Sequence, residues 1–165
     1  MIRPSLTARL ETQLDALDTI LADAAPQLLA RRPTSGAWSA HEHLAHLARH
    51  HDIFLERLRR VASEDRPTLG RYRAEDDPEW PSWSALPTAD VLSRLRYLRA
   101  RIIQWVADLK PADTSRVAVH PLFGEQTVGD LLEFFLLHEG HHLYVAKVRI
   151  GEARKADSPR VGRGF

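Results

Sequence analysis

The chain of 165 residues contains no cysteine, which excludes disulfide bonds, thiolate metal ligands and a cysteine nucleophile. No apolar run reaches the roughly 18 residues that span a membrane, and the N-terminus lacks a signal-peptide pattern. The net charge is only +1, with 23 basic and 22 acidic residues, so we expect no nucleic-acid or membrane partner. These absences predict a soluble, cytoplasmic protein of one domain.

Apolar residues at helical spacing dominate the remaining sequence. A first amphipathic pattern covers residues 6–28, with Ser5 as its expected N-cap and Pro26 as the residue that ends or kinks the helix. A third pattern follows Thr88 and stops at Pro111. Both patterns predict a helix with one apolar face turned toward a common core.

Two further helices carry start signals. The serine and glutamate of residues 39–42 form a capping box, which predicts a second helix over residues 40–63. The threonine and aspartate of residues 127–130 open the last helix, which is expected to stop at Gly151.

The connections complete the expected architecture. Residues 64–87 form a long crossover rich in proline and charge, and residues 117–119 are expected to be a brief extended piece. Four helices with little strand potential predict an all-α four-helix bundle over residues 1–152. Residues 153–165 are then expected to be a weakly ordered tail.

Eight of the nine histidines gather in two clusters, at residues 41–51 and 138–142. In the later cluster, His138 and His142 lie about 40° apart on the apolar helix face, whereas His141 lies on the flank. Two imidazoles one helical turn apart suit the chelation of one transition-metal ion. The alternative is a hydrogen-bonded pair inside the core, which is costly because each buried ring needs polar partners.

The earlier cluster is less easily sorted. His43, His46 and His50 share one side of their helix, bordering the core, while His41 lies on the far side and His51 falls among apolar residues. Periodicity does not decide which of the three bordering histidines is a ligand. A solvated histidine-rich face is the competing interpretation.

The segments WSAHEHLAHL and HPLFGEQTVGDLLEFFLLHEGHHLYVAKVR resemble the second and fourth helices of the DinB/YfiT-like metalloprotein superfamily. The resemblance covers essentially the whole chain, because helix number, crossover and motif order agree. It implies an up-up-down-down style four-helix bundle. It also implies a divalent metal ion held by three histidines, one from the second helix and two, four residues apart, from the last.

Carried onto this chain, the resemblance places the metal ligands at His46, His138 and His142, with His43 and His50 as geometric rivals of His46. Zinc or nickel is the expected ion, and iron is also compatible with imidazole ligands. Glu42 and Glu139 are candidates to accept the other N–H of the ligand rings. No catalytic residue is assigned.

Aromatic and basic side chains surround these motifs. Trp38 is expected to pack at the helix entrance, and Tyr72, Trp80 and Trp83 are expected to cover the bundle end or to wall a pocket above the metal. The arginines of the second helix are expected to form a solvated face, from which one could reach an anionic substrate: Arg49, Arg57, Arg59 and Arg60.

The leading functional hypothesis is a metal-dependent enzyme, either a thiol-dependent transferase or a hydrolase, which acts on a small molecule. One alternative is a non-catalytic metal-binding or stress-response protein, and another is a histidine network without metal. A low-molecular-weight thiol is the expected co-substrate, and a homodimer is the expected assembly.

Overall fold

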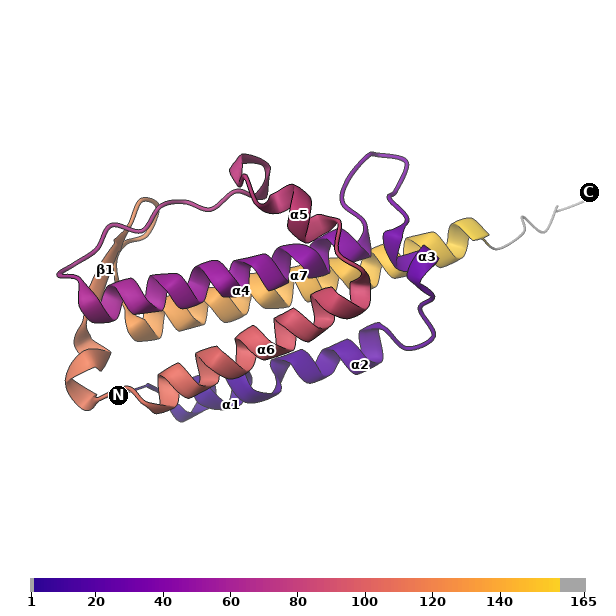
Figure 1. Cartoon of the computed structure of the whole chain (residues 1–165). Coiled ribbons are helices and arrows are strands. Elements are labelled where there is room, and N and C mark those ends of the chain that lie inside the picture. Colours follow the sequence, from indigo (N-terminus) through magenta and orange to yellow (C-terminus); the bar gives the residue numbers. More distant parts are fainter. Residues whose placement is uncertain (1, 158–165) are drawn as a thin grey trace, which may run out of the picture.

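Residues 2–157 are described by the structure, a computed structural model, and their long helices lie side by side along one axis (Figure 1). The helical elements are α1 (Pro4–Thr12), the 3-10 turn η1 (Gln13–Asp15), α2 (Ala16–Ile20), α3 (Pro26–Ala30), α4 (Ala40–Ser63), η2 (Ala74–Asp76), α5 (Trp80–Ser84), α6 (Thr88–Ala107), η3 (Pro111–Ser115) and α7 (Val128–Asp157). The α1–η1–α2 rod, α4, α6 and α7 form the predicted four-helix bundle.

The four rods run up, down, down and up in chain order (Figure 1). Arg3 forms an ion pair with Glu133, so α1 and α7 begin at the same end, and His41 bonds to Thr88, so α4 and α6 begin together at the opposite end. The expected up-up-down-down order is therefore wrong. The chain reverses over residues 21–39, which makes α4 antiparallel to the first rod.

The starts of α4 and α7 confirm the two predicted capping motifs. Ser39 Oγ accepts a hydrogen bond from the Glu42 backbone N–H, and the Glu42 carboxylate accepts one from the Ser39 backbone N–H. Thr127 and Asp130 exchange equivalent hydrogen bonds before α7. These local bonds satisfy backbone donors that a helix start leaves free, and they fix where each helix begins.

Other helix ends differ from the predictions. Helix α1 starts at Pro4 rather than after an N-cap at Ser5, because proline fits the first helical position. The first rod ends at Ile20, before Pro26, since Asp23 adopts a left-handed backbone conformation with φ of 57°.

The last helix continues past Gly151, where it was expected to stop, and reaches Asp157. Glycine weakens a helix interior by only about 1 kcal/mol, and tertiary contacts beyond it outweigh that loss. Ala153 is buried, and Asp157 forms an ion pair with Arg31. Part of the expected tail is thus helical, and residues 158–165 lie outside the described part of the chain.

A small hairpin precedes α7. Strand β1 (Val117–His120) confirms the expected extended piece and pairs antiparallel with β2 (Gly124–Thr127). Gly124 has a φ of 68°, a left-handed conformation that closes the three-residue loop between the strands. The start of the 64–87 crossover is tied to the same hairpin, because the Leu69 backbone N–H donates to the Val119 carbonyl at 2.8 Å.

The core fills the space between the four rods. Leucines of the first rod, α4 and α6 are almost fully buried together with Phe135 and Leu136 of α7. Within residues 2–157, no helix is both long and apolar enough to cross a lipid bilayer.

Candidate metal centre

Five histidines line the contact between α4 and α7. On α4, His43, His46 and His50 are three and four residues apart, so they share the helix face that meets α7. All three are buried, and this excludes the solvated histidine face. Because α7 runs antiparallel to α4, its His138 and His142 lie opposite them in reverse order.

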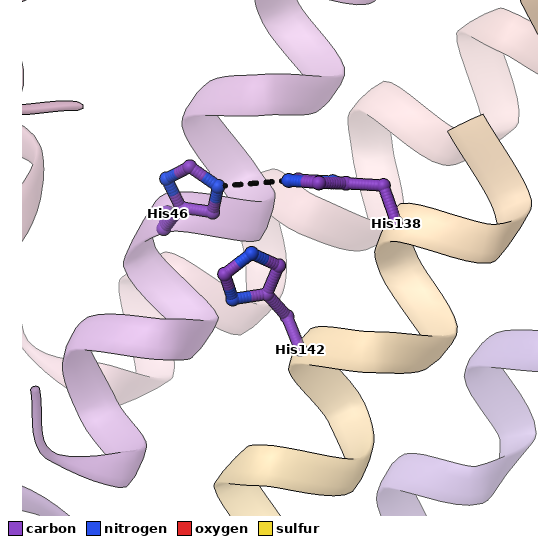
Figure 2. A group of neighbouring side chains, drawn as sticks. All are labelled: His46, His138 and His142. Carbon is purple, nitrogen blue, oxygen red and sulfur yellow. Dashed lines mark hydrogen bonds between the residues drawn. The ribbon is translucent and has the colours of Figure 1, made fainter. Parts of the chain in front are cut away.

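Three of these rings converge on one point. Figure 2 shows His46 from α4 directed toward His138 and His142 from α7, and one ring nitrogen from each lies within 4.8 Å of the other two. The Nε2 atoms of His46 and His138 are 3.2 Å apart. Nitrogens that share a tetrahedral zinc ion, each at about 2.0–2.1 Å, are roughly 3.4 Å apart. The His46–His138 pair therefore already has nearly the spacing of two ligands of one ion, and a His142 nitrogen lies within 4.8 Å of both.

His43 and His50 extend the cluster at its two ends. His43 Nδ1 lies 2.8 Å from His142 Nδ1, and the ring centres of His50 and His138 are 4.1 Å apart. Over the described residues, however, the compact group of potential ligands contains His46 and neither of its rivals.

Burial keeps these histidines neutral. Loss of hydration, reinforced by the positive charge that neighbouring histidines would carry, lowers the pKa of His46 to about 3 and that of His142 to about 2. Burial likewise lowers the pKa of His138 to about 4. At pH 7 each ring therefore carries one unprotonated nitrogen, the form that binds a metal ion.

The polar surroundings of the rings are incomplete. The Nδ1 atoms of His46, His50 and His138 are buried and have no hydrogen-bond partner in the described structure. Unpartnered polar atoms in the interior are costly, and they are tolerated where function requires them. Three neutral imidazoles whose nitrogens converge, among them the Nε2 atoms of His46 and His138, fit the donor set of a divalent metal ion.

Glu42 and Glu139, the sequence-based candidates for orienting the ligand rings, have other partners. Glu42 binds the start of α4 and Arg32. Glu139 is fully buried and binds Arg99 and Gln13. That prediction is wrong because Glu139 lies about 100° around α7 from His138, on the face that packs toward α6 and the first rod.

Aromatic side chains orient the rings instead. Trp38 lies 5.2 Å from His46, between ring centres, and stacks on Trp80 at 5.0 Å. Tyr72 stacks on His46 at 5.5 Å. Trp83 lies apart from this group, under the guanidinium groups of two arginines and with its Nε1 donating to Glu79. The crossover residues Tyr72 and Trp80 thus wall the centre, whereas Trp83 packs against the bundle.

The remaining histidines have separate environments. His41 bonds to Thr88 Oγ1 and to the Ser84 carbonyl, and His51 Nδ1 donates to the Leu47 carbonyl at 2.7 Å. His141 is exposed, as predicted. Sequence reasoning missed His120, the ninth histidine, which is buried at the end of β1. Its signal was its position in the short HPLFG turn, shortly before the helix that carries His138 and His142.

Curated relatives have names that match this geometry. A protein of Oceanobacillus iheyensis, provisionally named a metal-dependent hydrolase, is 31% identical over 111 residues, which are 66% of this chain and 63% of that protein. A protein of Bacillus mycoides with the same provisional name is 28% identical over 107 residues, 65% of this chain and 61% of that protein. The matches therefore span less than two thirds of either relative.

Solved structures match the bundle over most of its length. YfiT from Bacillus subtilis superposes with a TM-score of 0.72 at 18% identity, and the match covers 92% of this chain and 85% of YfiT. YfiT is described as a probable metal-dependent hydrolase with an unusual four-helix bundle topology. The four-helix bundle protein TT2238 superposes with a TM-score of 0.56 at 27% identity, covering 87% of this chain and 97% of TT2238. The likeness to YfiT shows a shared fold.

The family assignment rests on the chain from the first rod to the histidine-containing part of α7. Residues 9–146 match the family model and contain all five histidines of the α4–α7 contact. The relatives, the bundle and the three converging histidines all agree with this match. The chain belongs to the DinB superfamily.

Proposed function

We propose that the protein binds one divalent metal ion through His46, His138 and His142 and uses it to catalyse a reaction of a small molecule. The convergence of three neutral imidazoles within 4.8 Å, one of them buried and two half-buried, carries this proposal. Three histidine ligands leave coordination positions open for water or substrate, as in catalytic rather than structural sites. We expect zinc or nickel, with iron as the next choice, and imidazole ligands are compatible with all three ions.

A bound ion would supply Lewis acidity and lower the pKa of a coordinated water or thiol. The residues around it hold the rings and exclude solvent: Trp38, Tyr72 and Trp80 cover the His46 side. Glu42 and Glu139 bind other groups, so neither is free to act as a general base. The reaction therefore favours a nucleophile that loses its proton easily.

A low-molecular-weight thiol meets that requirement, because a thiol pKa near 8.5 lies far below that of water. We infer thiol-dependent transfer as the reaction. The thiolate sulfur forms a bond to an electrophilic carbon, the leaving group departs with its bonding electrons, and the thiol proton passes to solvent. Hydrolysis is the second candidate, supported by the names of the relatives and by neutral His43, 2.8 Å from His142, as a proton acceptor.

Metal content tests the premise that both candidate reactions share, which is metal binding by the three histidines. The purified protein should hold about one zinc or nickel ion per chain by elemental analysis, and His142→Ala should lose most of it. His141→Ala is the matched control, because His141 is the adjacent but exposed histidine and should leave metal content unchanged. Equal metal content in wild type and His142→Ala would overturn the proposal.

Turnover distinguishes the two reactions. The metal-loaded protein is assayed with glutathione, mycothiol or bacillithiol together with a chloronitroaromatic electrophile, and separately with ester and amide substrates without thiol. Product formation that requires thiol supports transfer, and thiol-independent cleavage supports hydrolysis. Full metal occupancy without either activity would make the protein a metal-binding protein rather than an enzyme.

A further inference from the structure

A cavity of about 180 Å³ adjoins the histidine cluster on the side of His138, between α4, α7 and the β1–β2 hairpin. Arg57, Arg71 and His120 contribute to its wall, together with Phe123 and Phe134. Among residues 2–157, no aspartate or glutamate lines it. The cavity therefore combines an apolar surface with positive charge that no acidic side chain of its wall balances.

The two arginines differ from most others in the protein. Ion pairs hold a dozen arginines of the described chain, yet they include neither Arg57 nor Arg71. Arg57 is partly buried, and its guanidinium donates to the Gly70 carbonyl at 2.5 Å, which fixes one edge of the group. A partly buried cation without a counter-ion is unfavourable, and an anionic ligand offsets that cost.

The positive charge of Arg57 affects the histidines around the cavity. It lowers the pKa of His120 and contributes to the lowered pKa of His50 and His138, after the larger effect of burial in each case. Arginine itself stays protonated at neutral pH. The positive potential thus extends from the cavity to the edge of the proposed metal centre.

The other part of the cavity wall is apolar and aromatic. Phe123 stacks on His120 with ring centres 4.7 Å apart, and it contacts Phe134 at 5.0 Å. Phe123 is 49% exposed, so it offers ring surface to a ligand. Such a wall fits a planar or apolar body next to a charged end group.

We propose that this cavity binds the substrate as an organic anion, with a carboxylate or phosphate end held by Arg57 and Arg71 and an apolar body against Phe123 and Phe134. The guanidinium fork matches both oxyanions. His138 belongs to the cavity wall and to the proposed metal centre, so the anion positions the rest of the substrate beside the metal. This assignment of substrate class rests on the proposed metal-dependent function.

The test measures binding rather than turnover. Benzoate, phenyl phosphate and neutral benzamide are titrated by calorimetry into metal-free and metal-loaded protein. Benzoate or phenyl phosphate should bind, benzamide should bind at least about tenfold more weakly, and Arg57→Gln should weaken anion binding about tenfold or more. The stronger of the two anions identifies a carboxylate or a phosphate as the natural end group.

Arg71→Gln is the second variant, because Arg71 is exposed and its loss should leave folding intact. Arg73→Gln is the matched control on the same segment, since Arg73 is also exposed and pairs with Asp76 outside the cavity. The proposal is overturned if benzamide binds as tightly as benzoate, or if the Arg57 and Arg71 variants bind the anions as well as Arg73→Gln does. Benzoate binding to the metal-free protein tests anion binding in the cavity without any metal. A failure of the protein to take up metal would therefore count against the proposed function alone.

Discussion

Two kinds of buried polar chemistry occupy different faces of α7. His138 and His142 face α4 as neutral rings, whereas Glu139, one residue away, pairs with Arg99 toward α6. Burial lowers the pKa of Arg99 to about 9, which leaves its guanidinium charged at pH 7. Glu139 is therefore the buried counter-ion of Arg99, and its role is to stabilise the fold behind the proposed metal centre.

Glu139→Gln should destabilise the protein by about 3–5 kcal/mol, because it leaves Arg99 as a buried, uncompensated cation. Urea unfolding measures the change in the free energy of unfolding. Glu133→Gln is the control, since Glu133 pairs with the exposed side chains of Arg3 and Arg9 and should cost less than about 1 kcal/mol. Equal losses in the two variants would contradict a structural role for the buried pair.

The proposed metal ligands were predictable from the sequence to different degrees. His138 and His142 could be selected from the sequence, because residues four apart share a helix face and the apolar pattern of α7 shows which face is inward. His46 could not be separated from His43 and His50 by periodicity. The choice depends on how α4 lies against α7, which is tertiary information, and only the family resemblance supplied it.

At the scale of elements, α4 is the helix whose start matters most to the site. Its capping box lies immediately before the turn that carries His43, and Ser39 is almost fully buried. The box is a local motif, so the start of α4 and that of α7 could be predicted from sequence alone. The ends of α2 and α7 could not, because a left-handed Asp23 and the packing of Ala153 decide them.

Ser39→Ala should lower the free energy of unfolding by about 1 kcal/mol, since it removes the acceptor for the Glu42 backbone N–H. Ser63→Ala provides a comparison at the other end of the same helix, where the exposed Ser63 hydroxyl only donates to the Arg59 carbonyl. That variant should change stability by less than about 0.5 kcal/mol. Chemical denaturation of both variants measures the difference, and a Ser39→Ala protein as stable as Ser63→Ala would argue against the cap.

At the scale of the whole molecule, folding gathers a set of histidines away from water. His43 and His138 have pKa values lowered to about 4, and His46 to about 3, each mainly by burial. An exposed histidine of the unfolded chain has a pKa near 6.5. Below about pH 6.5 the unfolded chain therefore binds more protons than the folded chain, and this difference favours unfolding.

The metal-free protein should accordingly keep its full stability above about pH 6.5 and lose it progressively as the pH falls from about 6.5 toward 4. Urea unfolding at intervals between pH 8 and pH 5 measures this slope. His46→Gln should flatten the slope, because it removes one titrating group from the interior, whereas exposed His141→Gln should leave it unchanged. Stability that stays level over this range would show that the rings are not buried as neutral groups.

The parallel course of α4 and α6 has a consequence for how this protein can diversify. Two neighbouring helices that run the same way need a connection about as long as a helix, and here residues 64–87 supply it along the outside of the bundle (Figure 1). Connecting segments tolerate insertion and substitution far better than packed helices do. Because Tyr72 and Trp80 of this segment cover the histidines, sequence drift in the connection can reshape what reaches them while α4 and α7 stay constant. The proposed metal ligands on α4 and α7 can thus be kept while the residues that cover them change.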